Sequence, residues 1–267
     1  FDFSTEKLDA CFDSLEEFVV KGSLFVLYKT HTDIVAVFLI NSYHLYIWCY
    51  YICMKVLDIP LRTQEKGSLD CGPTCVQMVL EYFGVNQDLE SLKDKLLYNE
   101  VGTTAYDNGG LLLDFGLKVT AITAQPRLFS PDSIEGITSK ELLYEVIQKK
   151  IEQVKELRDK DNLETFKKFL HKGGECKLEI PSFRHIKESI DSNQPIIALL
   201  IAQALGSKEG GYHFVVISGY DEGRVHITNP GPNSSKQAWF PADRFLYGLH
   251  ASTVGDFDNG TLLVVSK

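Results

Sequence analysis

The sequence predicts an α+β fold in which a helical N-terminal half precedes an antiparallel sheet. Apolar residues recur at helical spacing after residue 70, which indicates a first group of helices. Between residues 195 and 265, runs rich in β-branched and aliphatic residues indicate strands. Two of these runs meet at Asp221-Glu222-Gly223, a natural hairpin turn, so they are expected to pair antiparallel. Helices followed by such a sheet are typical of α+β domains.

The composition is that of a globular protein with one main domain. Of the 267 residues, 44% are hydrophobic and 24% are charged, which is enough apolar material for one sizeable core. The net charge of −9, from 27 basic and 36 acidic residues, gives no attraction toward phosphate backbones. We therefore expect no nucleic-acid partner.

The six cysteines are too scattered for a disulfide framework. Free thiols in a reducing compartment are the simpler interpretation, so we expect a cytoplasmic protein in which one cysteine can be chemically active. Cys71 and Cys75 lack the further ligands that a structural zinc site needs, so neither a metal ion nor a cofactor is expected. The cysteines are Cys11, Cys49, Cys53, Cys71, Cys75 and Cys176.

Residues 1–53 form an N-terminal extension for which several interpretations stay open. Residues 34–54 contain no Asp, Glu, Lys or Arg, and they are long enough to cross roughly 30 Å of hydrocarbon as a helix. Their many Ile, Val, Phe and Tyr residues suit buried strands equally. Alternatively, residues 1–53 are non-native sequence upstream of a start at Met54, and this interpretation is slightly favoured. Membrane association through 34–54 is therefore possible but is not the expectation.

The main domain, residues 54–267, begins with helices. Asp70 is a candidate N-cap, Pro73 stands in the first turn, and Gly84 ends the first helix. The apolar stripe of this helix is Val76, Val79, Leu80 and Phe83. It is followed by helices at 89–97 and 110–115 and by an alternating strand at 117–121.

Residues 131–174 are charge-rich and strongly periodic, which predicts a helical hairpin inserted into the domain. Thr138 and Glu141 are placed as a capping box, and the apolar stripe of the first, long helix runs from Leu143 to Leu157. We expect the hairpin over or beside the functional cleft, with a position on the far surface as the alternative. The remaining elements are a helix at 182–190 and strands at 195–201, 212–220, 224–228 and 261–265.

Cys71 is the candidate nucleophile. It begins the first helix, where unpaired backbone N–H groups and the positive end of the helix dipole favour an anion. We therefore expect the pKa of its thiol to fall below about 8.5. A small buried apolar residue is the alternative interpretation of Cys71. Cys75, one helical turn further on, lacks free N–H groups and is interpreted as core.

His213 is the candidate base, and Asn229 is the candidate orienting residue. His213 opens a strand, and the hairpin brings Asn229 within about one or two residues of lying opposite it. The amide oxygen could then accept an imidazole N–H and fix the tautomer. Asn229 before Pro230 is also ordinary turn punctuation, and Asp221 is a rival orienting group. The remaining histidines are assigned to the surface or to packing.

Gln64 stands seven residues before Cys71. With the backbone N–H of Cys71, its side-chain amide could bind the oxyanion that forms when a thiolate attacks a carbonyl. Each such donor can contribute about 10²–10³ in rate. A solvated loop glutamine is the alternative interpretation.

These residues together resemble a known family. The segments 64–75 (Gln-Glu-Lys-Gly-Ser-Leu-Asp-Cys-Gly-Pro-Thr-Cys) and 211–220 (Gly-Tyr-His-Phe-Val-Val-Ile-Ser-Gly-Tyr), closing on Asn229-Pro230, resemble the papain-like cysteine peptidases that cut double-glycine leader peptides. The chain looks most like the stand-alone members, which lack an attached transporter. The resemblance covers 54–130 and 181–267.

The resemblance implies a papain-like cysteine peptidase fold with a catalytic triad of Cys71, His213 and Asn229 and with Gln64 as oxyanion donor. Two departures stand out. The family usually places its glutamine about six residues before the cysteine, and it commonly has Asp where this chain has Asn229.

The expected function is that of a thiol protease, a hydrolase that cleaves a peptide or isopeptide bond through an acyl-enzyme on Cys71. Its partner would be a peptide or protein substrate. An acyltransferase or transpeptidase that uses the same triad is one alternative. A non-catalytic peptide-binding domain is another.

Overall fold

The computed structural model describes the strand backbone at 14–20, 23–29, 35–41 and 44–46, and residues 54–96, 102–208, 210–232 and 236–267. Two compact units are distinguished, Phe1–Val56 with Tyr220–Gly223, and Leu57–Gly219 with Arg224–Lys267. The first unit holds a four-stranded antiparallel sheet in the order β1-β2-β3-β4. Its strands are β1 (Ser14–Val20), β2 (Ser23–Lys29), β3 (Val35–Asn41) and β4 (His44–Tyr46).

The open interpretations of the N-terminal extension fall mainly on residues outside the described ones. Within 34–54, only 35–41, 44–46 and Met54 are described, and the first two ranges are strands. Cys11, Cys49 and Cys53 lie outside the described residues. In the part of the chain that is described, no helix is both long enough and apolar enough to cross a membrane.

The larger sheet has eight strands, in the order β11-β10-β9-β8-β12-β6-β7, with β5 paired to β9. Its inner strand β8 reads Ile-Ile-Ala-Leu-Leu-Ile and is buried along almost its whole length, as expected of a continuous apolar run covered on both faces. The strands are β5 (Lys55–Val56), β6 (Lys118–Ile122), β7 (Glu175–Lys177), β8 (Ile196–Ile201), β9 (Tyr212–Asp221), β10 (Arg224–Asn229), β11 (Lys236–Pro241) and β12 (Leu262–Ser266).

One strand pair departs from the predicted antiparallel sheet. β8 pairs antiparallel with β9 and β12, β12 with β6, and β10 with β11, but β6 and β7 run parallel. A parallel pair needs a crossover connection, and the helical segment between β6 and β7 supplies it. The helical hairpin is therefore the connection that sets the direction of β7.

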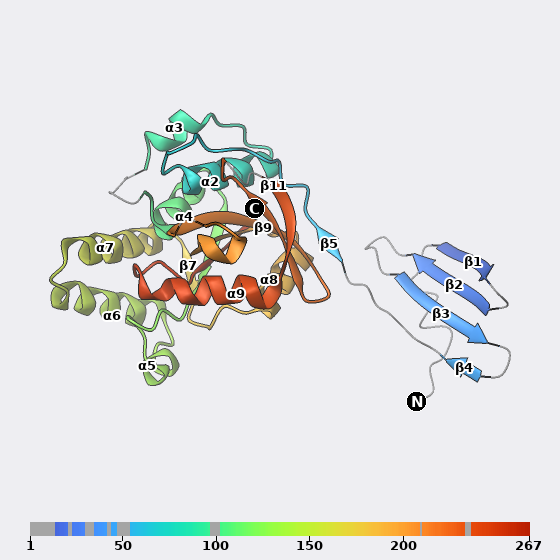
Figure 1. The fold of residues 1–267 in the computed structure, drawn as a ribbon. Helices are drawn as coiled ribbons and strands as arrows, with labels where there is room; N and C mark the ends of the chain where they lie inside the picture. Colours follow the sequence, from blue (N-terminus) through green and yellow to red (C-terminus); the bar gives the residue numbers. More distant parts are fainter. Residues whose placement is uncertain are drawn as a thin grey trace. The chain divides into compact units, whose positions relative to one another are not determined.

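The helices gather in separate groups around this sheet. Figure 1 shows α2, α3 and α4 close together and apart from α9, while α6 and α7 lie side by side. The α+β class and the order of helices before sheet are thus confirmed. The helices are α2 (Cys71–Tyr82), α3 (Leu89–Lys93), α4 (Ala105–Asp114), α5 (Pro131–Gly136), α6 (Lys140–Gln153), α7 (Leu157–His171), α8 (Phe183–Asp191) and α9 (Ala242–Ala251), with short 3₁₀ helices η1 (Ala202–Leu205) and η2 (Ser252–Val254).

Several predicted helix ends are wrong. The hairpin is capped by Ser139, whose side chain accepts from the N–H of Leu142, and not by Thr138. The long helix ends at Gln153 because Val154 adopts extended backbone angles, so Leu157 begins the next helix. The third helix starts well before residue 110, at a capping box formed by Thr104 and Asp107. The sequence analysis also missed α5, α9, β7 and β11.

α7 belongs to the core of the larger unit. The ring of Phe166 is fully buried and stacks on Tyr106 of α4, with ring centroids 4.0 Å apart and an interplanar angle of 6°. Phe169 packs beside it, 5.8 Å from the same tyrosine. The hairpin is therefore anchored by aromatic contacts and is more than a surface ornament.

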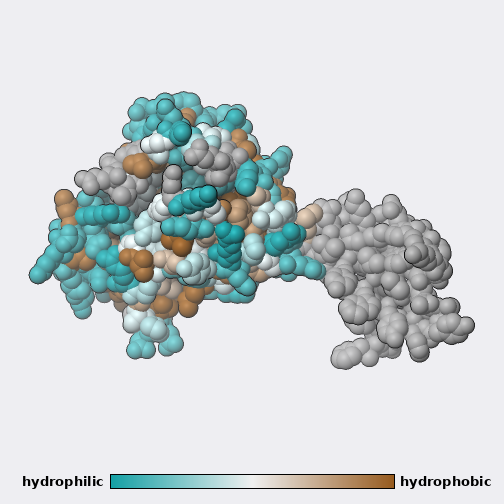
Figure 2. Space-filling model, in the orientation of Figure 1, coloured by the Kyte–Doolittle hydropathy of each residue, from teal (hydrophilic) through white to brown (hydrophobic). Residues whose placement is uncertain are grey.

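On the outside, Figure 2 shows a largely hydrophilic face with hydrophobic residues in scattered patches.

We predict that a chain beginning at Met54 folds. From Leu57 onward, the described buried residues form a hydrophobic core within a compact unit that begins at Leu57. Thermal unfolding of the shortened and full chains should give closely similar midpoints. A shortened chain that is insoluble, or that melts far below the full chain, would show that residues 1–53 are a necessary structural part.

Candidate active site

Cys71 is the first residue of α2. Asp70 takes the N-cap position, but its side chain makes no capping hydrogen bond and lies instead 3.2 Å from Nζ of Lys93. The prediction of a side-chain cap is therefore wrong, because the carboxylate pairs with a lysine. The main-chain carbonyl of Asp70 accepts from the N–H and the hydroxyl of Thr74, at 2.9 and 2.7 Å. The backbone N–H groups of Cys71 and Gly72 are left to interact with the Cys71 sulfur.

Gly72 allows this helix to approach α4 closely. A Cβ atom on Gly72 would collide with the Thr103 hydroxyl and lie 2.5 Å from Nδ2 of Asn108. Asn108 is fully buried, and its Nδ2 donates to the same hydroxyl at 3.1 Å. The glycine next to Cys71 therefore serves close packing, and this packing holds the position of the sulfur.

The pKa of the Cys71 thiol is raised above its ordinary value. Burial is the main cause, because it disfavours the charged thiolate, and hydrogen bonds from the backbones of Phe214 and Gly72 oppose it. The expected fall in this pKa is thus wrong: desolvation outweighs the helix N-terminus. The contact with Phe214, the residue directly after His213, brings the sulfur to the mouth of β9.

His213 and Asn229 are joined by a direct hydrogen bond. Nε2 of His213 lies 2.8 Å from Oδ1 of Asn229, which is the last residue of β10. The same oxygen accepts from the backbone N–H of Gly231 at 2.8 Å. The two sequence interpretations of Asn229 are therefore compatible, because the same oxygen starts the turn and meets the imidazole. The rival Asp221 lies at the far end of β9 from His213.

This arrangement determines the tautomer of His213. A backbone N–H can only donate, so the Asn229 atom that meets Gly231 must be the oxygen. That oxygen can only accept, so Nε2 of His213 carries the hydrogen and Nδ1 keeps its lone pair. Burial lowers the pKa of His213, and the bond to Asn229 opposes this effect. The ring is therefore a neutral base at neutral pH.

Cys71 and His213 lie near each other without a mutual hydrogen bond between these two described residues. The sulfur reaches the backbone of Phe214, one residue beyond the histidine. In unliganded enzymes, catalytic hydrogen bonds are often long and shorten only when substrate binds.

Gln64 is held beside Asn229. Its backbone N–H donates to the carbonyl of Pro230 at 2.9 Å, and its Nε2 donates to the carbonyl of Ser68 at 3.0 Å. The side chain is 8% exposed, so the interpretation as a solvated loop residue is wrong. Its Oε1 is buried without a partner among the described residues. Within the seven-residue spacing, Gly67 has a φ of +82°, a left-handed conformation that favours glycine.

Two cavities flank these residues. One of about 40 Å³ is lined by Cys71 and Phe214. The other, of about 660 Å³, is lined by Gln64, His213 and Asn229. Cys71 thus lines one of these cavities and His213 lines the other.

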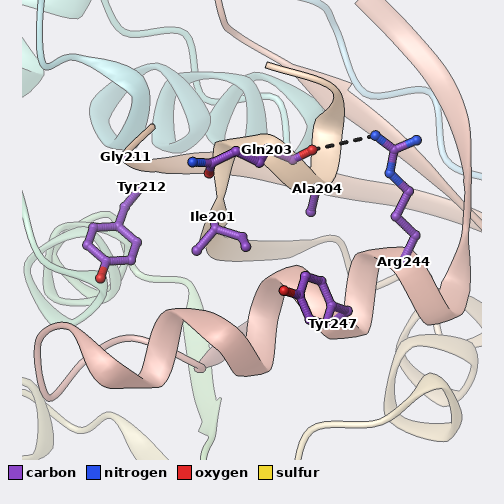
Figure 3. Close-up of a pocket in the computed structure, with 7 residues that line it drawn as sticks. All are labelled: Ile201, Gln203, Ala204, Gly211, Tyr212, Arg244 and Tyr247. Carbon is purple, nitrogen blue, oxygen red and sulfur yellow. Dashed lines mark hydrogen bonds between the residues drawn. The ribbon is translucent and has the colours of Figure 1, made fainter. Parts of the chain in front are cut away.

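Tyr212 lines both cavities, and it also lines a third of about 630 Å³ (Figure 3). This third cavity lies between the strand ends and α9, with Tyr247 and Arg244 on the helix side. The Arg244 guanidinium donates to the carbonyl of Gln203 at 3.5 Å. Sequence reasoning missed Tyr212, although an aromatic residue directly before the candidate base was a signal for it.

An acidic loop, residues 255–260, closes the cavity beside Cys71. Asp258 accepts from the N–H of Ala105 at 2.6 Å and from Nδ2 of Asn162 at 2.7 Å. Asp256 pairs with Arg158. Burial raises the pKa of Asp258 to about 6. Because Arg158 and Asn162 belong to α7, this helix of the hairpin contacts the loop that lines the cavity beside Cys71.

Other candidate groups are structural. Cys75 is fully buried and belongs to the core, as expected. His185 is also buried, where its Nδ1 accepts from the N–H of Ser182 in a capping box and its Nε2 meets Glu179 at 2.9 Å. Among the described residues, no group of three or more His, Cys, Asp or Glu is arranged to hold a metal ion.

Comparisons place these features beside known proteins. The family model described as Peptidase_C39 like family matches residues 56–247. One similar solved structure is a double glycine motif protease from an AMS/PCAT transporter in complex with the leader peptide, at 15% identity over 79% of this chain and 94% of that chain, with a TM-score of 0.40. A search of the curated proteins returns no match.

Two further structures are similar. A protein described as a C39-like peptidase from Bacillus anthracis is 14% identical over 80% of this chain and 98% of that chain, with a TM-score of 0.47. The peptidase domain of Streptococcus ComA, a bi-functional ABC transporter, is 16% identical over 78% and 98%, with a TM-score of 0.41.

The pKa shifts predict how Cys71 reacts with iodoacetamide. With the thiol pKa raised and the His213 pKa lowered, both groups are neutral at pH 7, so labelling above pH 7 should rise about tenfold per pH unit up to the raised pKa. Cys71 should still label before Cys75 and Cys176, whose pKa values burial raises well above the ordinary value and to about 12 respectively. Mass mapping against time measures this. A rate plateau below pH 6 would instead indicate a thiolate–imidazolium pair.

Proposed function

The chain belongs to the Peptidase_C39 like family, and from this premise we propose that it is a cysteine peptidase that cleaves a peptide or isopeptide bond through an acyl-enzyme on Cys71. The observation that carries the proposal is the fixed tautomer of His213, held through Asn229 and Gly231. A ring with Nε2 protonated offers Nδ1 as the base. That nitrogen is the one available to the thiol.

In the proposed acylation step, Nδ1 of His213 removes the Cys71 proton as the sulfur attacks the substrate carbonyl carbon. A carbon–sulfur bond forms, and the carbonyl oxygen becomes an oxyanion. The intermediate then breaks its carbon–nitrogen bond, and His213 returns the proton to the departing amine. The product is a thioester on Cys71.

Hydrolysis completes the cycle. A water molecule gives one proton to His213 while its oxygen attacks the thioester carbonyl. The carbon–sulfur bond breaks, the carboxylic acid leaves, and the proton restores the Cys71 thiol. Because both resting groups are neutral, the proton moves only when the sulfur attacks.

The oxyanion would be bound by the backbone N–H of Cys71 and by Nε2 of Gln64. Nε2 uses one hydrogen for the carbonyl of Ser68, which holds the side chain in place. Its second hydrogen has no acceptor among the described residues. A preorganised donor of this kind contributes about 10²–10³ in rate.

The cavity beside Cys71 favours small residues immediately before the scissile bond. Its volume is about 40 Å³. The cavity beside His213 is far larger, at about 660 Å³. We therefore expect glycine or alanine to be accepted beside Cys71 more readily than leucine.

Activity is tested with peptides that carry glycine or leucine before the scissile bond. The wild-type chain should cut the glycine peptides, and a rapidly denatured sample should carry an acyl adduct on Cys71 by mass spectrometry. Cys71→Ala should abolish both signals, whereas Cys176→Ala, which removes another half-buried thiol, should keep them. A folded wild-type chain that cuts no peptide and forms no adduct contradicts the proposal. An added amine that appears in the product in place of water would point to acyl transfer.

Removing the Asn229 oxygen should lower kcat. Asn229→Ala releases the imidazole, and we expect a loss of about 10²–10⁴-fold. Asn229→Asp keeps an acceptor for both His213 and Gly231, so it should restore most of the activity. Its negative charge should also raise the pKa of His213, which moves the acidic limb of the kcat/KM profile to higher pH. Equal losses in both variants, with no shift in the profile, would indicate that the residue acts only through the turn.

A further inference from the structure

The large cavity beside His213 carries a concentration of positive charge. Lys66, Lys208 and Lys236 all line it, and all three side chains are exposed. No Asp or Glu is among the described residues that line it. This is unexpected in a chain with a net charge of −9. The charge is therefore local to the cleft and is not a property of the whole surface.

Some basic residues outside this cavity are paired with carboxylates. Lys93 lies 3.2 Å from Asp70, Lys172 lies 2.6 Å from Asp114, and Arg62 lies 2.7 Å from Glu81. Within the described part of the chain, none of the three cavity lysines has an ion-pair partner. Like charges around one cavity repel each other, and an anionic occupant would relieve this repulsion.

The chemistry of the cleft indicates which part of a substrate meets these lysines. In the proposed reaction, His213 protonates the departing amine, so the residues after the scissile bond leave from the His213 side. The cavity lined by His213 and Asn229 is therefore the leaving-group side. The cavity lined by Cys71 holds the acyl side, where Asp256 and Asp258 are found instead of lysines. Among the described residues, lysines therefore line the leaving-group side and not the acyl side.

Gln64 adds an independent observation on the leaving-group side. Its buried Oε1 has no hydrogen-bond partner among the described residues, and the residue lines the same cavity. A buried acceptor without a donor is uncommon in native structures. This oxygen is covered in the unliganded chain, so the backbone N–H of an extended peptide would supply the missing donor only after a shift of the side chain or its loop.

We propose that this cavity binds an acidic peptide segment, so that preferred substrates carry Asp or Glu within the first few residues after the scissile bond. This specificity rests on the proposed peptidase function. Exposed lysines give modest and salt-sensitive attraction, so the effect belongs to selectivity and not to the chemical step.

The test compares peptides that are identical before the scissile bond and carry Glu, Gln or Lys at the second and third positions after it. For the wild-type chain, we expect kcat/KM to be about tenfold higher with Glu than with Gln and lowest with Lys. Added salt should reduce this preference. In a variant with Lys66→Gln, Lys208→Gln and Lys236→Gln, the Glu and Gln peptides should be cut at rates within about twofold of each other.

The matched control is Lys118→Gln, Lys149→Gln and Lys177→Gln. It removes the same charge from exposed lysines outside the cavity, so it should keep the tenfold preference. Equal cleavage of the Glu, Gln and Lys peptides by the wild-type chain overturns the proposal while leaving the peptidase function intact. A preference that both triple variants lose equally also overturns it, because the cause is then net charge.

A binding measurement separates this proposal from the peptidase function. Fluorescent peptides that represent only the segment after the scissile bond, with Glu or Gln, are titrated into the Cys71→Ala chain. Tighter binding of the Glu peptide, lost in the Lys66, Lys208 and Lys236 variant, supports the acidic subsite even if no peptide is cut. Equal binding of the Glu and Gln peptides overturns it.

Discussion

One oxygen atom, Oδ1 of Asn229, holds the candidate site together. It accepts from Nε2 of His213 and from the N–H of Gly231, so it fixes the ring and ends β10 in a turn. The next carbonyl, that of Pro230, then accepts from the N–H of Gln64 and places that loop beside the histidine. An amide or carboxylate oxygen is needed here, because it must accept two hydrogen bonds in different directions. Base, turn and oxyanion candidate therefore depend on a single acceptor.

Burial decides the resting charges of the two reactive groups. At the start of α2 the helix dipole favours a thiolate by about 0.3–1 kcal/mol, but taking the sulfur out of water acts more strongly in the opposite direction. The same burial lowers the pKa of His213. An uncharged Cys71 and His213 lose little solvation free energy when they are shielded from water. A separated ion pair there would lose much more, and other groups would have to compensate for that loss. In the proposed mechanism, catalysis would therefore depend on preorganised acceptors and donors more than on a permanently charged nucleophile.

The sequence was sufficient for the features that follow local rules. Cys71 at a helix start, the hairpin that brings His213 and Asn229 together, and the continuous apolar strand β8 all follow from periodicity and turn chemistry. Long-range competition was not predictable in the same way. Asp70 takes the N-cap position before Cys71, but its carboxylate pairs with Lys93 instead of capping the helix. The expected fall in the Cys71 pKa is reversed by burial, which only the folded chain creates. The acidic loop at 255–260 reaches the site from a distant segment, so no local pattern predicted it.

The contacts between α7 and the loop at 255–260 separate two tasks that many enzymes assign to the same residues: shaping the substrate cavity and carrying out the chemical step. Asp256 and Asp258 shape the acyl-side cavity, yet their positions are set by Arg158 and Asn162, which belong to the hairpin. Substitutions in α7 can therefore reshape the cavity while every reactive group stays unchanged. During evolution, substitutions in the hairpin can therefore change substrate selectivity with little effect on the chemical step. For protein engineering, the hairpin offers positions for a mutant library that contact the cavity loop and not the nucleophile itself.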